Sequence, residues 1–364
     1  GYEPPWWWTI QLPSTLLAAL ATAYFGLGEA EREEFARLMR AAEAFSGVRV
    51  LAWTILSNHF HLLLEVPEKP EGFDLDEEEF WRRVGALYSE EEVREIQAVM
   101  RSFLAVPGGA AGAVMARDYR RRFLERMLDL SEFMKTLKQR FTVWFNARRE
   151  RVGTLWESRF RAVLVEADPE TLMKVSAYID LNAVRAGIVI DPEDYRWCGY
   201  AEALGARKGK TRRLAREGLG VVMGEASRSR VKGQPSTGEG VSASPLVVGG
   251  QGAAGGEASR ATVKGRQSTG RSAAEERREL RRMLAEYRRL LFGTGDGTVN
   301  ARGGFTQAEV EAVAAAGGKL TLAELLRCRV RHFTEGLVLG SRAFVERYYE
   351  GAREEFGVKR TSGA

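Results

Sequence analysis

The chain has 364 residues, of which 45% are hydrophobic, so it can hold two domains and a linker and can bury a sizeable core. The net charge of +5 and the pI of about 9.2 favour a polyanionic partner. The two cysteines, Cys198 and Cys328, lie far apart in the sequence and exclude a disulfide framework or a cysteine-based zinc site. We therefore expect a protein of the reducing cytoplasm.

The first two segments are expected to be helical. The apolar run of residues 16–26 is too short to span a bilayer and has no Lys or Arg before it, which favours a buried helix over a signal peptide or a membrane anchor. In residues 29–46, apolar side chains such as Phe35 and Leu38 recur at helical spacing, and Gly47 is a suitable stop.

A histidine pair follows in a predicted β-hairpin. Residues 48–55 and 60–66 are rich in β-branched, aromatic and aliphatic side chains and indicate two strands joined by a turn at Ser57-Asn58. Residues two apart in a strand share a face, so His59 and His61 point the same way. Two imidazoles aimed at one point suit a metal ion, although histidines at this spacing can also be ordinary core or surface residues.

The middle of the chain is predicted to be helical and basic. An acidic surface loop at 67–79 leads into a helical region at 78–104, and after a Pro-Gly-Gly break a second long helical region covers 117–150. Residues 117–161 carry 13 Lys and Arg against 6 Asp and Glu, a balance of +7. For one side chain such as Arg140 a solvated helix face is an adequate explanation, but the cluster as a whole favours contact with phosphates.

A second chemical element lies about 120 residues after the histidines. A predicted strand at 161–166 leads to a helix that begins at the N-cap Asp168 and stops at Gly187. Tyr178 and Asn182 are four residues apart and therefore share one face of this helix. A tyrosine hydroxyl beside a bound divalent cation can attack phosphate and form a covalent intermediate, and Asn182 offers a neutral oxygen as a ligand.

Four separated motifs carry a resemblance to a known family. The chain resembles the HUH single-tyrosine transposases, in the group of the REP-associated tyrosine transposases, over roughly residues 30–205. The matching stretches are SNHFHLL at 57–63, LWESRFR at 155–161, YIDLNAVRAG at 178–187 and DYRW at 194–197. The chain departs from the family at Ala183, where proline is usual, and its first strand is not evident.

The resemblance implies an α+β domain, in which an antiparallel sheet of ferredoxin-like or RRM-like type has helices on one face. It implies that His59, His61 and Asn182 hold Mg²⁺ or Mn²⁺ and that Tyr178 attacks single-stranded or hairpin DNA to leave a 5′-phosphotyrosine. The protein would be cytoplasmic, associated with the nucleoid and independent of membranes, and a homodimer is compatible with the resemblance. Asp180 should face away from the site. Candidate DNA contacts, each of which could instead belong to a structural ion pair, are Arg140, Arg159, Arg161 and Arg185.

The composition divides the chain into three parts. We expect residues 1–205 to form the transposase-like domain that the resemblance implies. Residues 206–273 form a flexible Gly/Ser/Arg-rich linker containing a duplication with a period of 32 residues, and residues 274–364 form a small helical module. The turns between these last helices are compatible with a helix-turn-helix DNA reader and equally with a packing or oligomerisation unit.

Two other functions remain open from the sequence. The altered N-terminus and Ala183 fit a domesticated or inactive sequence-specific DNA-binding protein derived from such a transposase. A metal-dependent phosphodiesterase that uses water as the nucleophile would leave Tyr178 without a role, and it ranks last for that reason.

Overall fold

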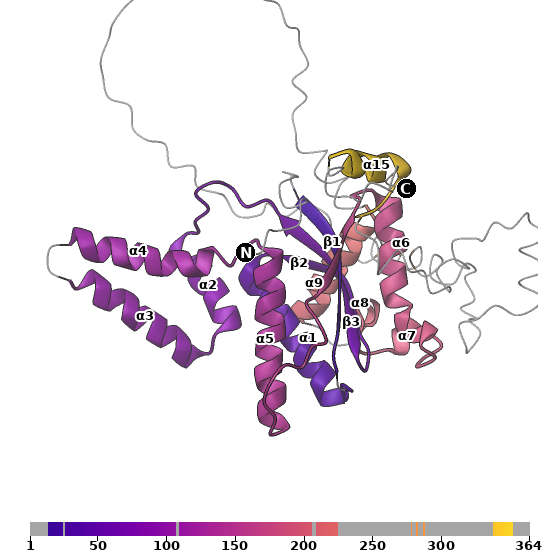
Figure 1. Ribbon diagram of the computed structural model, residues 1–364, viewed down its shortest axis with the longest axis horizontal. Coiled ribbons are helices and arrows are strands. Elements are labelled where there is room, and N and C mark those ends of the chain that lie inside the picture. The colour runs from indigo at the N-terminus through magenta and orange to yellow at the C-terminus, as the bar shows by residue number, and fades with distance from the viewer. Residues whose placement is uncertain are drawn as a thin grey trace, which may run out of the picture.

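A single mixed sheet forms the centre of the computed structural model (Figure 1). The structure describes residues 14–24, 26–106, 109–205, 209–224 and 338–351, with Arg278, Arg282 and Tyr287. The strands lie in the order β2-β3-β1-β4-β5; β5 is parallel to β4 and the other pairs are antiparallel. Their bounds are Ser14–Thr22 (β1), Arg49–Ile55 (β2), His59–Pro67 (β3), Arg161–Val165 (β4) and Val338–Leu339 (β5).

The predicted buried helix at residues 16–26 is wrong, because this run forms β1, which pairs with both β3 and β4. Alternate residues of β1 enter two different cores: Leu17 and Ala19 pack on one side of the sheet and Leu16 on the other. A strand buried on both faces is a continuous apolar run without alternation, so periodicity does not separate it from a buried helix. β1 also supplies the first strand that the sequence pattern did not reveal.

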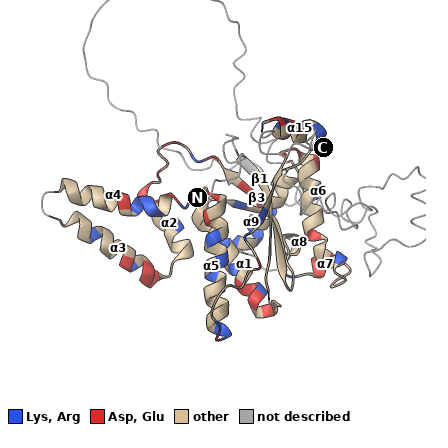
Figure 2. Cartoon of the chain, in the orientation of Figure 1, with Lys and Arg blue, Asp and Glu red and all other residues tan. Residues whose placement is uncertain are grey.

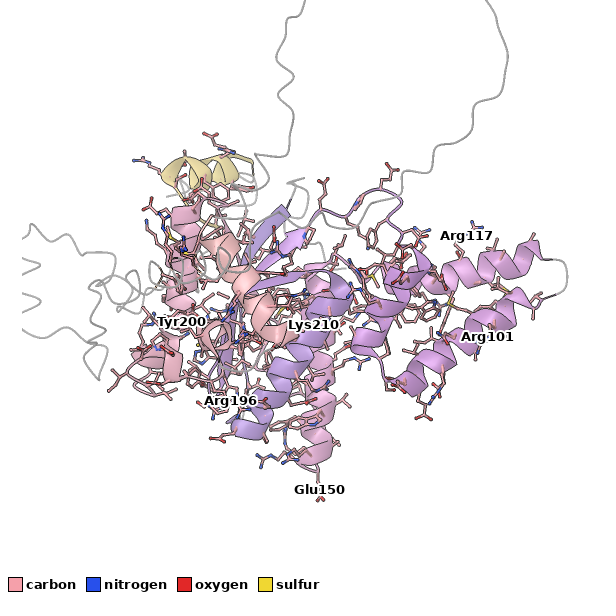
Figure 3. The ribbon with its side chains drawn as sticks, turned by 180° about the vertical axis from the view of Figure 1, so that it is seen from behind. Arg101, Arg117, Glu150, Arg196, Tyr200 and Lys210 are labelled. Atoms are coloured by element: carbon pink, nitrogen blue, oxygen red, sulfur yellow. The ribbon has the colours of Figure 1, made fainter. Side chains whose placement is uncertain are left out.

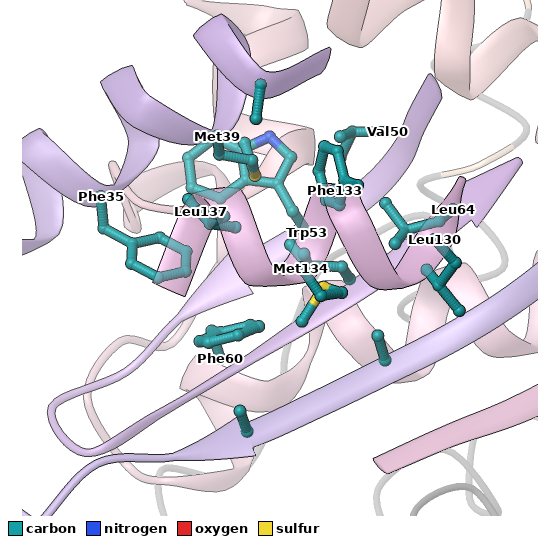
Figure 4. Close-up of a cluster of buried hydrophobic side chains, with 14 of the residues drawn as sticks. Phe35, Met39, Val50, Trp53, Phe60, Leu64, Leu130, Phe133, Met134 and Leu137 are labelled. Atoms are coloured by element: carbon teal, nitrogen blue, oxygen red, sulfur yellow. The ribbon is translucent and has the colours of Figure 1, made fainter. Parts of the chain in front are cut away.

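The α+β class and the antiparallel core agree with the sequence, but helices cover both faces of the sheet rather than one. On one face, α1 and α5 pack against each other over a core that contains Phe35, Phe60 and Leu137 (Figure 4). The other face is also apolar, with Leu51 and Leu63 buried, and therefore needs its own cover. The helices are Glu29–Ser46 (α1) and Leu130–Arg148 (α5) on the first face, and Pro169–Asp180 (α6), Gly199–Leu204 (α8) and Lys210–Val222 (α9) on the second.

Three helices between β3 and α5 project from the sheet as an arm (Figure 1). Each long helical region predicted here is interrupted. Ser89 caps a new helix in the first region, in a capping box with Glu92. In the second region the chain turns at Leu128, whose φ is +54°, and Asp129 caps α5. The helices of the arm are Glu77–Leu87 (α2), Glu90–Leu104 (α3) and Ala110–Leu124 (α4).

Parts of the predicted linker and C-terminal module contact the sheet domain. α9, which lies within the predicted linker, packs on β2. β5 extends the sheet beyond β4, and the following helix α15 (Arg342–Gly351) adds Phe344 and Tyr348 to the core under α1 and α5. The 32-residue duplication lies outside the described residues, and of the helices predicted for the helix-turn-helix only the last is described, as α15. In the part of the chain that the structure describes, no helix has the length and apolar character needed to cross a bilayer.

Candidate active site

The histidine pair lies where the β2–β3 hairpin turns. Phe60 and Leu62 point into the core under α1 and α5, so the alternation of β3 turns His59 and His61 to the face covered by α6. The two imidazole ring centroids are 5.2 Å apart with an interplanar angle of 85°. His61 is buried and His59 half-buried, so the pair lies between the sheet interior and the surface.

The helix that carries Tyr178 begins as the sequence predicts and ends earlier. The Asp168 carboxylate accepts hydrogen bonds from the backbone N–H groups of Glu170 and Thr171 at 3.0 and 3.1 Å. α6 then ends at Asp180, and a separate turn, α7 (Asn182–Arg185), follows. The expected continuous helix up to Gly187 is therefore two segments, and Asn182 opens the second.

The fold brings Tyr178 to the histidines. The ring centroids of His61 and Tyr178 are 6.1 Å apart and the rings meet edge to face at 88°. The Arg185 guanidinium carbon lies 3.9 Å from the centroid of the Tyr178 ring, and Arg185 Nη2 donates to the Tyr178 carbonyl oxygen at 2.5 Å. Tyr178 is 5% exposed, so Arg185 and the sheet together cover most of its surface.

The residues around the histidines fit a divalent cation. His59 Nδ1 lies 2.8 Å from Asn58 Oδ1, and the tautomer in which Nδ1 donates to this oxygen places the ring's lone pair on Nε2, the nitrogen that would bind a metal. Thr54, directly opposite His61 in the β2–β3 pair, has a buried hydroxyl oxygen without a hydrogen-bond partner among the described residues. Buried polar atoms are usually paired, so this oxygen suits a site that receives a polar ligand. The Asn182 side-chain nitrogen is also buried without a partner among these residues, but an amide N–H donates and does not bind a cation.

The ligand set differs from a carboxylate-rich centre. Within the described ranges, no group of three His, Cys, Asp or Glu side chains is placed to hold a metal. A cation here would combine the two imidazoles with neutral oxygen ligands, of which the Asn182 amide oxygen is the sequence-based candidate.

Two of the predicted DNA-contacting arginines lie at the histidine end of the sheet. Arg161 pairs with Leu20 of β1, and Leu20 pairs on its other side with His61, so Arg161 shares a row and a face with His61. Arg159 is exposed in the loop before β4, and Lys138 anchors this loop by donating to the Ser158 carbonyl oxygen at 2.9 Å.

The fourth predicted contact, Arg140, is not brought to this site. It lies on α5, on the opposite face of the sheet, with its guanidinium carbon 4.8 Å from the centroid of the Tyr88 ring. Other basic side chains of residues 117–161 form ion pairs, such as Arg120 with Asp74. Figure 2 shows the Lys and Arg residues spread over α2, α4 and α5 instead of gathered around α6.

A buried polar cluster behind α6 was not predicted from the sequence. The Tyr287 hydroxyl donates to Asp180 Oδ2 at 2.6 Å and lies 2.8 Å from Ser176 Oγ. The backbone N–H of Tyr200 donates to Asp180 Oδ1 at 3.3 Å. Burial raises the pKa of Asp180 to about 7. No local pattern indicates this cluster, because Tyr287 lies more than 100 residues along the chain from α6.

A second tyrosine lies at the same end of the sheet as the histidines. Tyr24 follows Thr22, which pairs with His59, and its side chain is 57% exposed. Its hydroxyl donates to the Glu157 carbonyl oxygen at 3.2 Å. No sequence pattern singles out Tyr24, because the run that precedes it is predicted to be a helix and not a strand.

Comparisons with known proteins leave the family open. No protein-family model matches the chain, and no curated protein matches it. Among solved structures, the chain is similar to a REP-associated tyrosine transposase bound to a REP hairpin, with 12% identity and a TM-score of 0.34. The match covers 58% of this chain and 92% of that chain. A likeness of this size does not establish a family, so the function has to be inferred from the residues of the site.

Proposed function

We propose that the protein is a DNA strand-transfer enzyme of the HUH single-tyrosine type, which cleaves and rejoins single-stranded DNA through Tyr178. The observation that supports this most directly is the approach of Tyr178 to His61, with ring centroids 6.1 Å apart. The two residues come from sequence positions more than 100 apart and from different elements. The order β2-β3-β1-β4 is also that of a ferredoxin-like sheet, which is the fold that the resemblance implies.

In this mechanism the phenol oxygen of Tyr178 attacks the scissile phosphorus and loses its proton to water. The bond from phosphorus to the 3′ oxygen breaks, and that oxygen takes up a proton as the free 3′-hydroxyl. A divalent cation held by His59, His61 and the Asn182 amide oxygen would polarise the phosphate.

The step exchanges the phosphodiester bond to the 3′ oxygen for a phosphodiester bond to the tyrosine oxygen, so the bond energy is retained. A 3′-hydroxyl can therefore reverse the step and join a new strand without an external energy source. The guanidinium groups of Arg161 and Arg185 supply positive charge on the face where the phosphate must lie.

Formation of a covalent adduct tests the proposal. The protein is incubated with end-labelled single-stranded hairpin DNA and Mn²⁺, and the products are separated under denaturing conditions. We expect a protein–DNA adduct that Tyr178→Phe abolishes. Tyr24→Phe is the matched control, because it removes a hydroxyl at the same end of the sheet and should keep the adduct. An adduct that survives Tyr178→Phe would overturn the assignment of the nucleophile.

A DNA-binding protein without catalysis is the second candidate, and the burial of Tyr178 favours it. Only 5% of this residue is exposed, and the Arg185 guanidinium lies over its ring, so little of Tyr178 is accessible to DNA in this conformation. Salt-dependent DNA binding without cleavage under Mg²⁺ or Mn²⁺ would support this candidate. Cleavage with turnover but without an adduct would support hydrolysis by water.

A further inference from the structure

We propose that Tyr287 is a positioning residue for the nucleophile helix, so that the chain beyond the linker completes the active site of the N-terminal domain. This inference rests on the proposed function, because it assigns Tyr287 its effect through Tyr178. Tyr287 lies far outside the stretch that carries the family resemblance, which ends near residue 205.

The contacts of Tyr287 are made with the turn of α6 that holds the nucleophile. Its side chain is fully buried, and its hydroxyl lies between Ser176 Oγ at 2.8 Å and Asp180 Oδ2 at 2.6 Å. Ser176 and Asp180 are two residues before and two residues after Tyr178. Positions two apart on a helix lie on nearly opposite sides, so Tyr287 binds the back of α6 while Tyr178 faces His61.

The same cluster joins α6 to α8. Asp180 Oδ1 accepts from the backbone N–H of Tyr200, near the start of α8, and the rings of Tyr200 and Tyr287 have centroids 5.6 Å apart. Tyr200, labelled in Figure 3, lies beside α6 and on the opposite side of the molecule from Arg101 and Arg117 of the projecting arm. The Tyr287 ring therefore packs between α6 and α8. Its hydroxyl is a hydrogen-bond partner for two buried polar atoms, Ser176 Oγ and Asp180 Oδ2.

This anchor lies next to the point where α6 ends. The helix stops at Asp180, and the Leu181 N–H is shared between the carbonyl oxygens of Ala177 and Ile179 as the chain passes into α7. A helix end has fewer intrahelical hydrogen bonds than its middle, so its last turn depends more on side-chain contacts. Misplacement of a reacting group by about 1 Å can slow catalysis on the order of 100-fold. Loss of the Tyr287 hydroxyl should therefore slow attack by Tyr178 without removing any group that contacts DNA.

The test uses the full chain with Tyr287→Phe, which keeps the ring and removes the hydroxyl. Tyr195→Phe is the matched control: its hydroxyl is also buried and also has two partners, the Ile55 carbonyl oxygen and Arg32, but neither lies on α6. Three quantities are measured for each variant: hydrogen–deuterium exchange of residues 169–180, the Kd for single-stranded DNA, and the single-turnover rates of cleavage and rejoining.

For Tyr287→Phe we expect faster exchange in α6, a Kd within about twofold of the parent, and cleavage and rejoining both slowed by about tenfold or more. A misplaced nucleophile should slow cleavage and rejoining equally. Its position changes the activation barrier that both reactions share but not the equilibrium constant between cleaved and joined DNA. Unchanged exchange and rates would overturn the inference, and so would equal slowing in Tyr195→Phe. If the parent protein forms no adduct, the proposed function fails and the positioning role fails with it, while the exchange data still decide whether Tyr287 anchors α6.

Discussion

Replacement of Asp180 by Asn should remove a large pH dependence of stability. Burial raises the pKa of Asp180 from 3.8 to about 7, against the smaller lowering effects of the hydrogen bonds from Tyr287 and Tyr200. A difference of roughly 3 pH units corresponds to about 4 kcal/mol, because each unit is worth about 1.4 kcal/mol. This figure is the free energy by which the ionised carboxylate is less favourable in the folded chain than in the unfolded chain.

The sign follows from which state holds the proton. Between about pH 4 and pH 7 the folded protein keeps the Asp180 proton, whereas the unfolded chain has lost it. The folded state binds more protons in this window, so the free energy of unfolding falls as the pH rises through it and then levels off. Asp180→Asn has no proton to lose, so this contribution to the slope disappears. Its amide oxygen can accept from the Tyr200 N–H in place of Oδ1, while its NH2 group, in place of Oδ2, can donate to the Tyr287 hydroxyl oxygen.

Urea unfolding followed by tryptophan fluorescence at several pH values between 4.5 and 8 measures this effect, with EDTA present so that metal binding does not contribute. The difference in unfolding free energy between the parent and Asp180→Asn should change by about 3 kcal/mol over this range, because the measurement begins above the pKa of the unfolded carboxyl. Asp76→Asn is the control, since it makes the same substitution at the exposed cap of α2, where Asn also caps well. Parallel curves for the parent and Asp180→Asn would refute the assignment of a buried, largely protonated carboxyl.

Three further outcomes follow from the packing. Gly218→Ala should lower the free energy of unfolding by about 1–3 kcal/mol in urea titrations, because a Cβ there would lie 2.8 Å from the Leu51 carbonyl oxygen and push α9 off β2. Phe60→Ala should cost about 3–5 kcal/mol by the same measurement, since its fully buried ring packs on Phe35 at 4.6 Å between centroids. Cys198 should react with a thiol reagent only after unfolding, as judged by mass spectrometry, because it is fully buried and burial raises the pKa of its thiol well above its usual range.

The parts of the site that the sequence could indicate are those set by local rules. Alternation along a strand places His59 and His61 on one face, and an N-cap followed by proline fixes the start of the helix that carries Tyr178. The end of that helix was not predicted from the sequence, because no glycine or proline marks the break at Leu181. Local patterns indicated the strand and the helix that hold the site. The distance of 6.1 Å between the ring centroids of His61 and Tyr178 depends instead on how the whole sheet is assembled.

The predictions that were wrong or missing concern features set by contacts between residues far apart in the sequence. β1 was taken for a helix because its two faces both pack against helices, which erases the alternation that identifies a strand. The helices on the second face were not expected, because the resemblance implied helices on one face only, and the apolar side chains of that face show that it needs a cover. The contact between Tyr287 and Asp180 spans 107 positions, and neither residue has a neighbour pattern that predicts the other.

The position of Tyr178 is set from two sides by elements that meet only in the folded chain. On one side His61 and Arg185 contact its ring, and on the other Ser176 and Asp180 hold the back of its helix to Tyr287. In the proposed mechanism, DNA replaces or shares the front contacts, which involve groups that suit a phosphate and a cation. The back contacts are buried and lie away from this front face. Under the same proposal, a nucleophile fixed from behind loses the cover of Arg185 without losing its direction, which strand cleavage and rejoining at one phenol would both require.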